Sequence, residues 1–147
     1  QGLRAELDTL TLPGSPALKL VYRLINQTAA YRDVEAGLMA FFQLDGTHKN
    51  GALHSRRMHR KRTPHMAWTL VEDWAAVENP ETGRAAILVA GGGAGRVQFL
   101  DWGEDGGHLY RFQNAQVPPL ETHETVTYLA LAPSLEEAKG YQGLRHL

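Results

Sequence analysis

Residues 18–46 read LKLVYRLINQTAAYRDVEAGLMAFFQLDG, and this stretch decides the fold class. Large apolar side chains recur at every second position from Leu18 to Leu24, which is the period of a strand with one buried face. The Asn-Gln-Thr sequence at 26–28 favours a turn. Residues 34–44 are apolar at both parities and predict a central strand buried on both faces. A short helix is the alternative for 34–44, because Ala, Leu and Met are good helix formers.

The segments around this stretch continue the strand pattern. The first residues alternate between apolar and charged types, and the apolar phase then shifts, which predicts a half-buried strand with a bulge near Thr9. Residues 66–79 predict one long strand or two short ones. The sequence Asn-Pro-Glu-Thr-Gly at 79–83 predicts a hairpin turn that leads into a buried strand at 85–90.

The C-terminal part predicts a last strand at 122–132, rich in Thr, Val and Tyr. Ser134 and Glu137 form a capping box, so we expect a short helix over 135–142. The chain therefore holds about eight to ten short strands separated by regular turn signals, a pattern that favours an antiparallel β-sandwich. We expect one all-β sandwich domain over residues 3–147, with a short C-terminal helix.

Composition excludes several classes of site and partner. The 147 residues carry a net charge of −1, so any electrostatic partner needs a local patch. Cysteine is absent, which excludes disulfides, thiolate catalysis and Cys-ligated metals. No apolar run reaches the roughly 18 residues of a membrane span, and no signal sequence is seen. We expect a soluble domain without a cofactor, and the compartment stays open.

The first two residues, Gln1-Gly2, match what a protease leaves at a cloned N-terminus. We therefore expect the natural sequence to begin near Leu3 and to belong to a larger protein.

Residues 45–64 are polar and predict a loop longer than an ordinary connection. This loop runs into HSRRMHRKRTPH at 54–65, the basic segment, which holds five of the 15 Lys and Arg residues: Arg56, Arg57, Arg60, Lys61 and Arg62. Such cations pair with phosphates, sulfates or uronate carboxylates. A solvated loop is the alternative, since the interleaved aromatic residues of a nucleic-acid platform are missing. We expect no nucleic-acid partner and hold open a protein or polyanion partner.

Histidines and glycines near this segment do not predict a metal or phosphate site. His54, His59 and His65 stand among cations without acidic ligands, so we expect no metal. His65, close to Trp68, instead suits hydrogen bonding in a sugar cleft. The GGGAGR sequence at 91–96 has neither the Lys-Ser/Thr of a P-loop nor dinucleotide spacing, and indicates a strand crossing or a flexible loop.

Aromatic residues near acidic ones are the strongest candidates for a binding site. Aromatic faces stack on sugar rings while carboxylates hold hydroxyl groups. The residues with this chemistry at strand ends or turns are Trp68, Trp74, Trp102 and Tyr110, with Asp101, Glu104 and His108. Tryptophans buried in the sandwich core are the alternative, above all for Trp68 and Trp74.

No catalytic residues are assigned from the sequence. His123 and Glu124 are neighbours in a predicted strand and point to opposite faces, so they do not form a dyad by sequence alone. No GxSxG sequence occurs. Whether the chain is an enzyme stays open.

Three passages resemble galactose-mutarotase-like sugar-binding sandwiches: residues 18–46, the hairpin WAAVENPETGRAAILVA at 74–90, and PPLETHETVTYLALAPSLEEA at 118–138. The resemblance implies a supersandwich fold and sugar recognition. The complete family fold is about twice this size, so the chain resembles its C-terminal half or a reduced relative. The family's catalytic Glu stands in a Leu-Glu-x-Gln-like context, whereas the corresponding RFQNAQVPPLE at 111–121 has no Glu before the glutamine. Epimerase catalysis is therefore not implied.

Two functions from different classes follow. The first is carbohydrate recognition through Trp68, Trp102, His108, Tyr110 and His65, with Arg56, Arg57 and Arg60 available for acidic groups. The second is a non-catalytic interaction module that docks a protein or polyanion through the basic segment. Sheet edges could also support oligomerisation.

Overall fold

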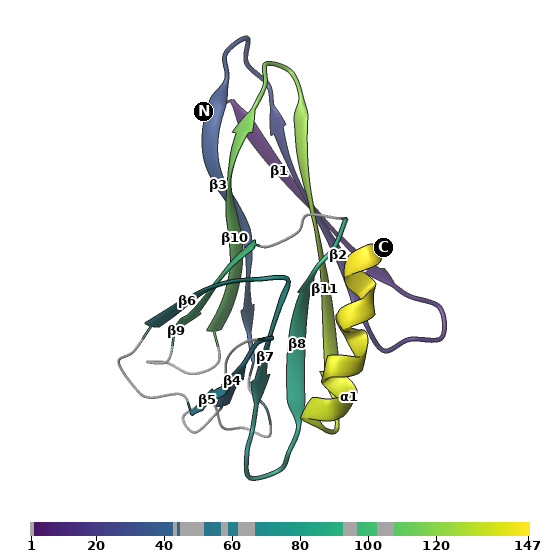
Figure 1. The fold of residues 1–147 in the computed structure, drawn as a ribbon. Helices are drawn as coiled ribbons and strands as arrows, with labels where there is room; N and C mark the ends of the chain where they lie inside the picture. Colours follow the sequence, from purple (N-terminus) through teal and green to yellow (C-terminus); the bar gives the residue numbers. More distant parts are fainter. Residues whose placement is uncertain are drawn as a thin grey trace.

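The computed structural model describes residues 2–42, 44, 52–56, 59–61, 67–92, 97–102 and 108–147. These ranges contain eleven strands, one α-helix and one 3₁₀ helix (Figure 1). The elements are β1 Leu3–Thr11, β2 Leu18–Asn26, β3 Arg32–Phe41, β4 Ala52–His54, β5 His59–Lys61, β6 Ala67–Glu72, β7 Trp74–Glu78, β8 Ala85–Ala90, β9 Val97–Trp102, β10 His108–Val117, β11 Thr122–Ala132, α1 Leu135–Lys139 and η2 Gly140–His146.

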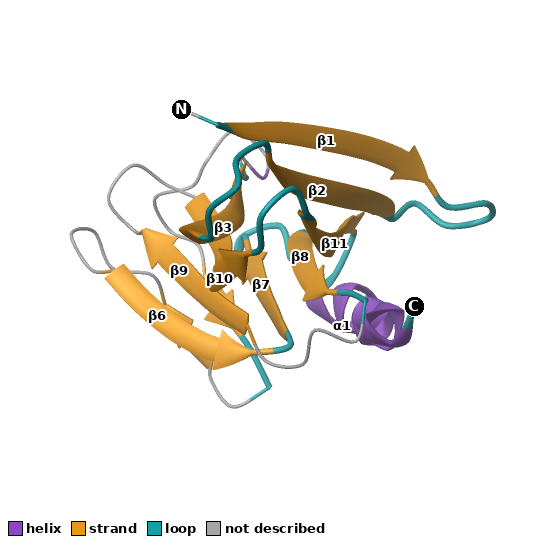
Figure 2. Ribbon diagram, turned by 90° about the horizontal axis from the view of Figure 1, so that it is seen from above, coloured by secondary structure: helices purple, strands orange, loops and turns teal. Residues whose placement is uncertain are grey.

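The strands form two packed antiparallel sheets. The large sheet has the order β1-β2-β11-β8-β7-β4-β5, and the small sheet has the order β3-β10-β9-β6. The helix α1 covers the face of the large sheet that is turned away from the small sheet, as Figure 2 shows from above. The predicted all-β sandwich with a short C-terminal helix is confirmed.

Strand β8 packs against both the small sheet and the C-terminal helix, and all six of its residues are buried. Ala86, Leu88 and Ala90 belong to the core between the two sheets, together with Leu109 of the small sheet. The alternate residues of β8 pack instead against the side of the large sheet that α1 covers. A strand covered on both faces is apolar at every position, as the AAILVA sequence predicts.

The side chain of Asn26 joins two of the connections at which the chain passes from one sheet to the other, β2–β3 and β10–β11. Its Nδ2 atom lies 2.7, 3.1 and 2.9 Å from the carbonyl oxygens of Ala30, Val117 and Pro118. Its Oδ1 atom accepts hydrogen bonds from the backbone and the hydroxyl group of Thr28. Asn26 is only 1% exposed, so these bonds form away from water. One amide thereby closes the β2–β3 and β10–β11 connections together.

Two sequence predictions for the N-terminal strands are wrong. Strand β1 pairs with β2 in one unbroken register from Leu3 to Thr11, without the bulge predicted near Thr9. It is also almost entirely exposed rather than half-buried, because it lies at the edge of the large sheet. Strand β3 is likewise an edge strand of the small sheet, and Met39 is 54% exposed. It is therefore not a central strand buried on both faces.

The polar stretch 45–64 is not a continuous loop. Residues of β4 are buried, and β4 pairs with β7 on one side and β5 on the other. Short strands of this kind carry too few residues to show a periodicity in the sequence. They raise the count of described strands to eleven, above the predicted eight to ten.

Other predictions are confirmed. Residues 66–79 contain two strands, β6 and β7, which belong to different sheets. The 79–83 turn joins β7 and β8, with Gly83 at φ 76°. Ser134 caps α1 by accepting a hydrogen bond from the Glu137 backbone, and the chain continues as η2 to His146. None of the described helices is long and apolar enough to cross a membrane.

We predict that Asn26→Asp destabilises the protein by about 3 kcal/mol or more, because it replaces the amide donor by a carboxylate oxygen that faces the carbonyl oxygens of Ala30, Val117 and Pro118. Chemical denaturation monitored by circular dichroism measures this loss. The neighbouring exposed Gln27→Glu is the matched control, and we expect it to change stability by no more than about 0.5 kcal/mol. Equal stability of the two variants would contradict the role of Asn26.

Candidate functional site

The register of the small sheet sorts the predicted binding residues onto two faces. Residues paired directly across antiparallel strands share a face. His108 pairs with Trp102 on β9, and Tyr110 follows His108 two positions further along β10. The positions of Trp102, His108 and Tyr110 therefore lie on one face. Trp68 pairs with Asp101, which precedes Trp102 on β9 and therefore lies on the opposite face of the small sheet. The structure brings the first three positions together and separates Trp68 from them.

Exposure identifies these two faces. Leu109 and Arg111 of β10 are fully buried, so their face is turned toward the large sheet, and we name it the inner face. Met39 pairs with Tyr110 and is exposed, so the face that holds Trp102, His108 and Tyr110 is the outer face.

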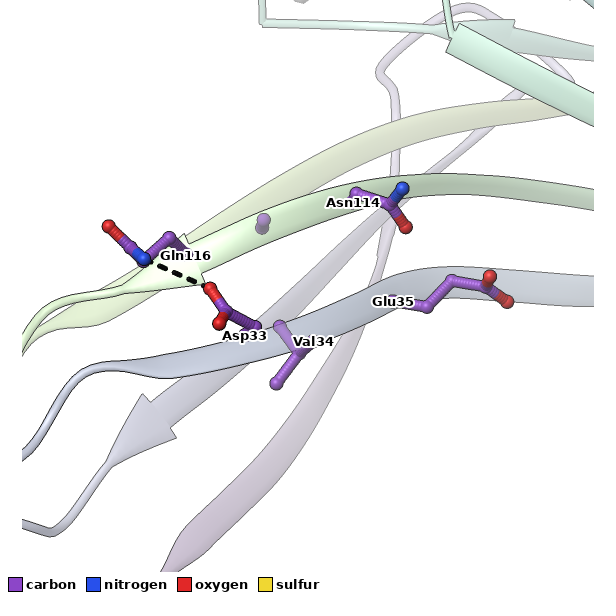
Figure 3. A pocket seen from close by; sticks show the side chains of 6 residues that line it. Asp33, Val34, Glu35, Asn114 and Gln116 are labelled. Atoms are coloured by element: carbon purple, nitrogen blue, oxygen red, sulfur yellow. Dashed lines mark hydrogen bonds between the residues drawn. The ribbon is translucent and has the colours of Figure 1, made fainter.

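A shallow hollow of about 540 Å³ opens along β3 and β10 (Figure 3). The polar residues that line it are Asp33, Glu35, Asn114 and Gln116, all exposed. Asp33 and Gln116 point toward each other, and Gln116 Nε2 donates a 3.0 Å hydrogen bond to Asp33 Oδ1. Asn114 and Gln116 have the same parity on β10 as Tyr110, so the hollow and the aromatic positions share the outer face.

The basic segment is only partly described. Arg56 is exposed and pairs with Asp73, whose Oδ2 also accepts a 2.8 Å hydrogen bond from Arg145 Nη1 of η2. Arg56 and Arg145 of η2 thus share the Asp73 carboxylate. Arg60 lies in β5, and its side chain is outside the described part of the structure. Arg57 and His65 also lie outside the described residues.

Between the two sheets lies a group of polar residues that the sequence analysis missed, from the inner face of β10 and from β11 of the large sheet. We name it the interior cluster: Arg111, Gln113, His123 and Thr125. Arg111 Nη2 donates to Gln113 Oε1 at 3.2 Å, and Gln113 Nε2 lies 2.9 Å from His123 Nε2. With its oxygen facing Arg111, the Gln113 amide donates to His123, whose Nε2 then accepts. The Thr125 hydroxyl lies 3.4 Å from the same nitrogen. The cluster joins β10 to β11 across the two sheets.

Burial changes the protonation chemistry of this cluster. Desolvation lowers the pKa of Arg111 to about 10, which still leaves the guanidinium charged at neutral pH. Burial is also the larger cause that lowers the pKa of His123, and the positive charge of Arg111 lowers it further. His123 is therefore a neutral hydrogen-bond acceptor near pH 7. Glu124, its sequence neighbour, is exposed and pairs with Arg23, so the two do not form a dyad.

The comparisons with known proteins find structural relatives only. No protein-family model matches the sequence, and no curated protein matches it. A protein from Klebsiella pneumoniae assigned as an aldose 1-epimerase superposes with a TM-score of 0.70 at 10% identity, over 97% of this chain and 50% of that one. A galactose mutarotase-like protein from Clostridium acetobutylicum superposes with a TM-score of 0.51 at 8% identity, over 88% and 62%.

The chain has a galactose-mutarotase-like fold. It spans 50% and 62% of the lengths of these two structures. The α-galactosidase of Lactobacillus brevis contains a similar unit, with a TM-score of 0.66 at 11% identity, over 96% of this chain and 23% of the enzyme. In all three structures the matching part is a portion of a longer chain.

The described part of the chain holds no group of three or more His, Asp or Glu residues arranged to bind a metal ion. Two buried ionisable side chains in or near the basic segment, His54 and Glu72, each have a hydrogen-bonding neighbour. His54 Nε2 lies 2.8 Å from Glu78 Oε2, and the Ser55 hydroxyl donates to Glu72 Oε1 at 3.4 Å.

We predict that His123 titrates below its ordinary 6.5 in the folded protein and that Arg111→Met raises its pKa, because the variant removes a nearby positive charge. Between 6.5 and the lower folded pKa, the unfolded chain binds a proton that the folded chain does not, so this group reduces stability as the pH falls. NMR titration of the His123 ring protons measures the value. Arg23→Met, which removes an outer arginine, should leave it unchanged. A His123 pKa at or above 6.5 would contradict the geometry.

Proposed function

We propose that this chain recognises a carbohydrate on the outer face of the small sheet, as one domain of a larger glycan-binding or glycan-active protein. The observation that carries the proposal is the shared face: Trp102, His108 and Tyr110 occupy outer-face positions in line with the polar hollow on β3 and β10. The structural relatives, which include proteins assigned to sugar epimerisation and α-galactosidase activity, agree with this choice of ligand class.

The proposed site has two ends, the aromatic positions and the polar hollow, and their chemistry is complementary. Indole and phenol rings offer apolar surface for the faces of sugar rings. The carboxylates of Asp33 and Glu35 accept hydrogen bonds from hydroxyl groups, and the amides of Asn114 and Gln116 both donate and accept. Tyr110 and Asn114 stand four residues apart on β10, about 13 Å along the strand. A ligand that uses both ends is therefore an oligosaccharide rather than one sugar unit.

The basic segment supports the alternative of polyanion docking less well. Arg56 already pairs with Asp73 inside the chain, so docking a polyanion would compete with that ion pair. The two functions differ in their response to salt. Binding through the basic segment weakens steeply as salt rises. Binding of a neutral sugar on the outer face does not.

We predict that Tyr110→Ala and Trp102→Ala each weaken binding of a neutral oligosaccharide about ten-fold, the effect of losing roughly 1.4 kcal/mol of stacking. Glycan-array screening finds the ligand, and titration calorimetry at two salt concentrations measures the affinity. Tyr31→Ala is the matched control, because Tyr31 is 62% exposed in the turn before β3, away from Tyr110. Melting temperatures show that each variant is folded.

Two results would overturn this proposal. The first is an equal loss of affinity in Tyr31→Ala and Tyr110→Ala, which would mean that the outer-face position of Tyr110 is not the reason. The second is an absence of binding to every oligosaccharide tested at millimolar concentration.

A further inference from the structure

Arg111 is the largest fully buried side chain in the described part of the protein, and it has no counterion there. It is 0% exposed, and among the described residues its side chain donates one hydrogen bond, from Nη2 to Gln113. Its Nε and Nη1 atoms are buried without a hydrogen-bond partner. No carboxylate among the described side chains forms an ion pair with it. An arginine that retains its charge in the interior is normally paired with an anion or with a full set of acceptors.

The residues opposite Arg111 also leave a polar atom unused. Gln113 meets His123 of β11, and Leu109 belongs to the core cluster against which Leu129 packs. Arg111 lies between Gln113 and Leu109 on β10, so the stretch of β11 between His123 and Leu129 faces it. Thr127 lies in this stretch, is fully buried, and its hydroxyl group has no hydrogen-bond partner. Two nitrogens and one hydroxyl group thus remain available between the sheets.

This arrangement suits a small anion better than a neutral group. Arginine nitrogens and a threonine hydroxyl are donors, and anions with several oxygens accept from all of them. Gln113 and His123 are half-buried, so the interior cluster reaches solvent through them. The His123 Nε2 atom already accepts a hydrogen bond from Gln113, and Gln113 Oε1 already accepts one from Arg111. Neither residue therefore supplies an acceptor for the two remaining Arg111 nitrogens.

We propose that Arg111, with the Thr127 hydroxyl group, binds a carboxylate or phosphate group between the two sheets. The site is separate from the outer face, so it holds whether or not the carbohydrate proposal does. A free anion and an acidic group on a sugar are two sources of the same chemistry. Inorganic phosphate and acetate represent the first source, and glucuronate compared with glucose represents the second.

The test is thermal unfolding of the whole chain with increasing phosphate, acetate, glucuronate or glucose, each at constant ionic strength set with chloride. A ligand that binds only the folded state raises the melting temperature along a saturating curve. We expect saturation with at least one anion and no effect of glucose. Arg111→Met should abolish the shift, and Arg111→Lys should weaken the apparent affinity at least ten-fold, because lysine lacks the planar fork. Arg23→Met, the surface control, should retain the wild-type curve.

Without anions, Arg111→Met should be at least as stable as the wild-type protein, because an unpaired buried charge is replaced by an apolar side chain. A large loss of stability in this variant would show that Arg111 has a counterion within the chain and would overturn the proposal. Shifts that do not saturate, or that persist in Arg111→Met, would assign the effect to the general action of salts. That result would overturn it as well.

Discussion

The amide of Asn26 is the interaction on which the two-sheet arrangement depends. The connections after β2 and after β10 are two of the places where the chain changes sheet, and the Asn26 amide donates to carbonyl oxygens in both of them. Pro118 and Pro119 supply no N–H groups, while the Glu121 N–H donates to the Pro118 carbonyl oxygen at 3.3 Å and the Leu120 N–H to that of Thr28. A buried carbonyl without a donor is costly, so the Asn26 amide holds β3 and β10 in a defined position against β2 and β11.

The position of β10 against β11 decides which side chains of β10 face the interior. Leu109 and Val117 are fully buried at the two ends of the strand, and Arg111 and Gln113 necessarily follow them inward, since side chains alternate along a strand. The same alternation turns the positions of His108, Tyr110 and Asn114 outward. The alternation thus produces both an outer face suited to a neutral polar ligand and an inner face with an arginine that has no counterion among the described side chains. The two candidate sites share a strand but not a surface.

The sequence predicted some elements well and others poorly, for identifiable reasons. The strands at 18–26, 85–90 and 122–132 and the cap at Ser134 were predicted because apolar periodicity and hydrogen-bond capping act over a few residues. The exposure of β1 and the edge position of β3 could not be predicted, because the neighbours of a strand in a sheet come from distant parts of the chain. Trp68 and Trp102 were grouped by residue type, yet the register of β6 and β9 places them on opposite faces. The burial of Arg111 cannot be predicted from the sequence, because a single arginine within an alternating strand has the pattern of an ordinary outward-facing residue.

By itself, the sequence determined the all-β class, the turns, the capped terminal helix and the absence of thiol chemistry, since each of these depends on residue types and short spacings. Only the tertiary structure decided which parity of each strand is buried, which strands lie at edges, and which polar groups meet across the sheets. The physical reason is clearest on β10, where both parities carry large side chains. Local pattern leaves its two faces equivalent, and packing against β11 breaks that equivalence by burying Leu109 and Val117 together with Arg111.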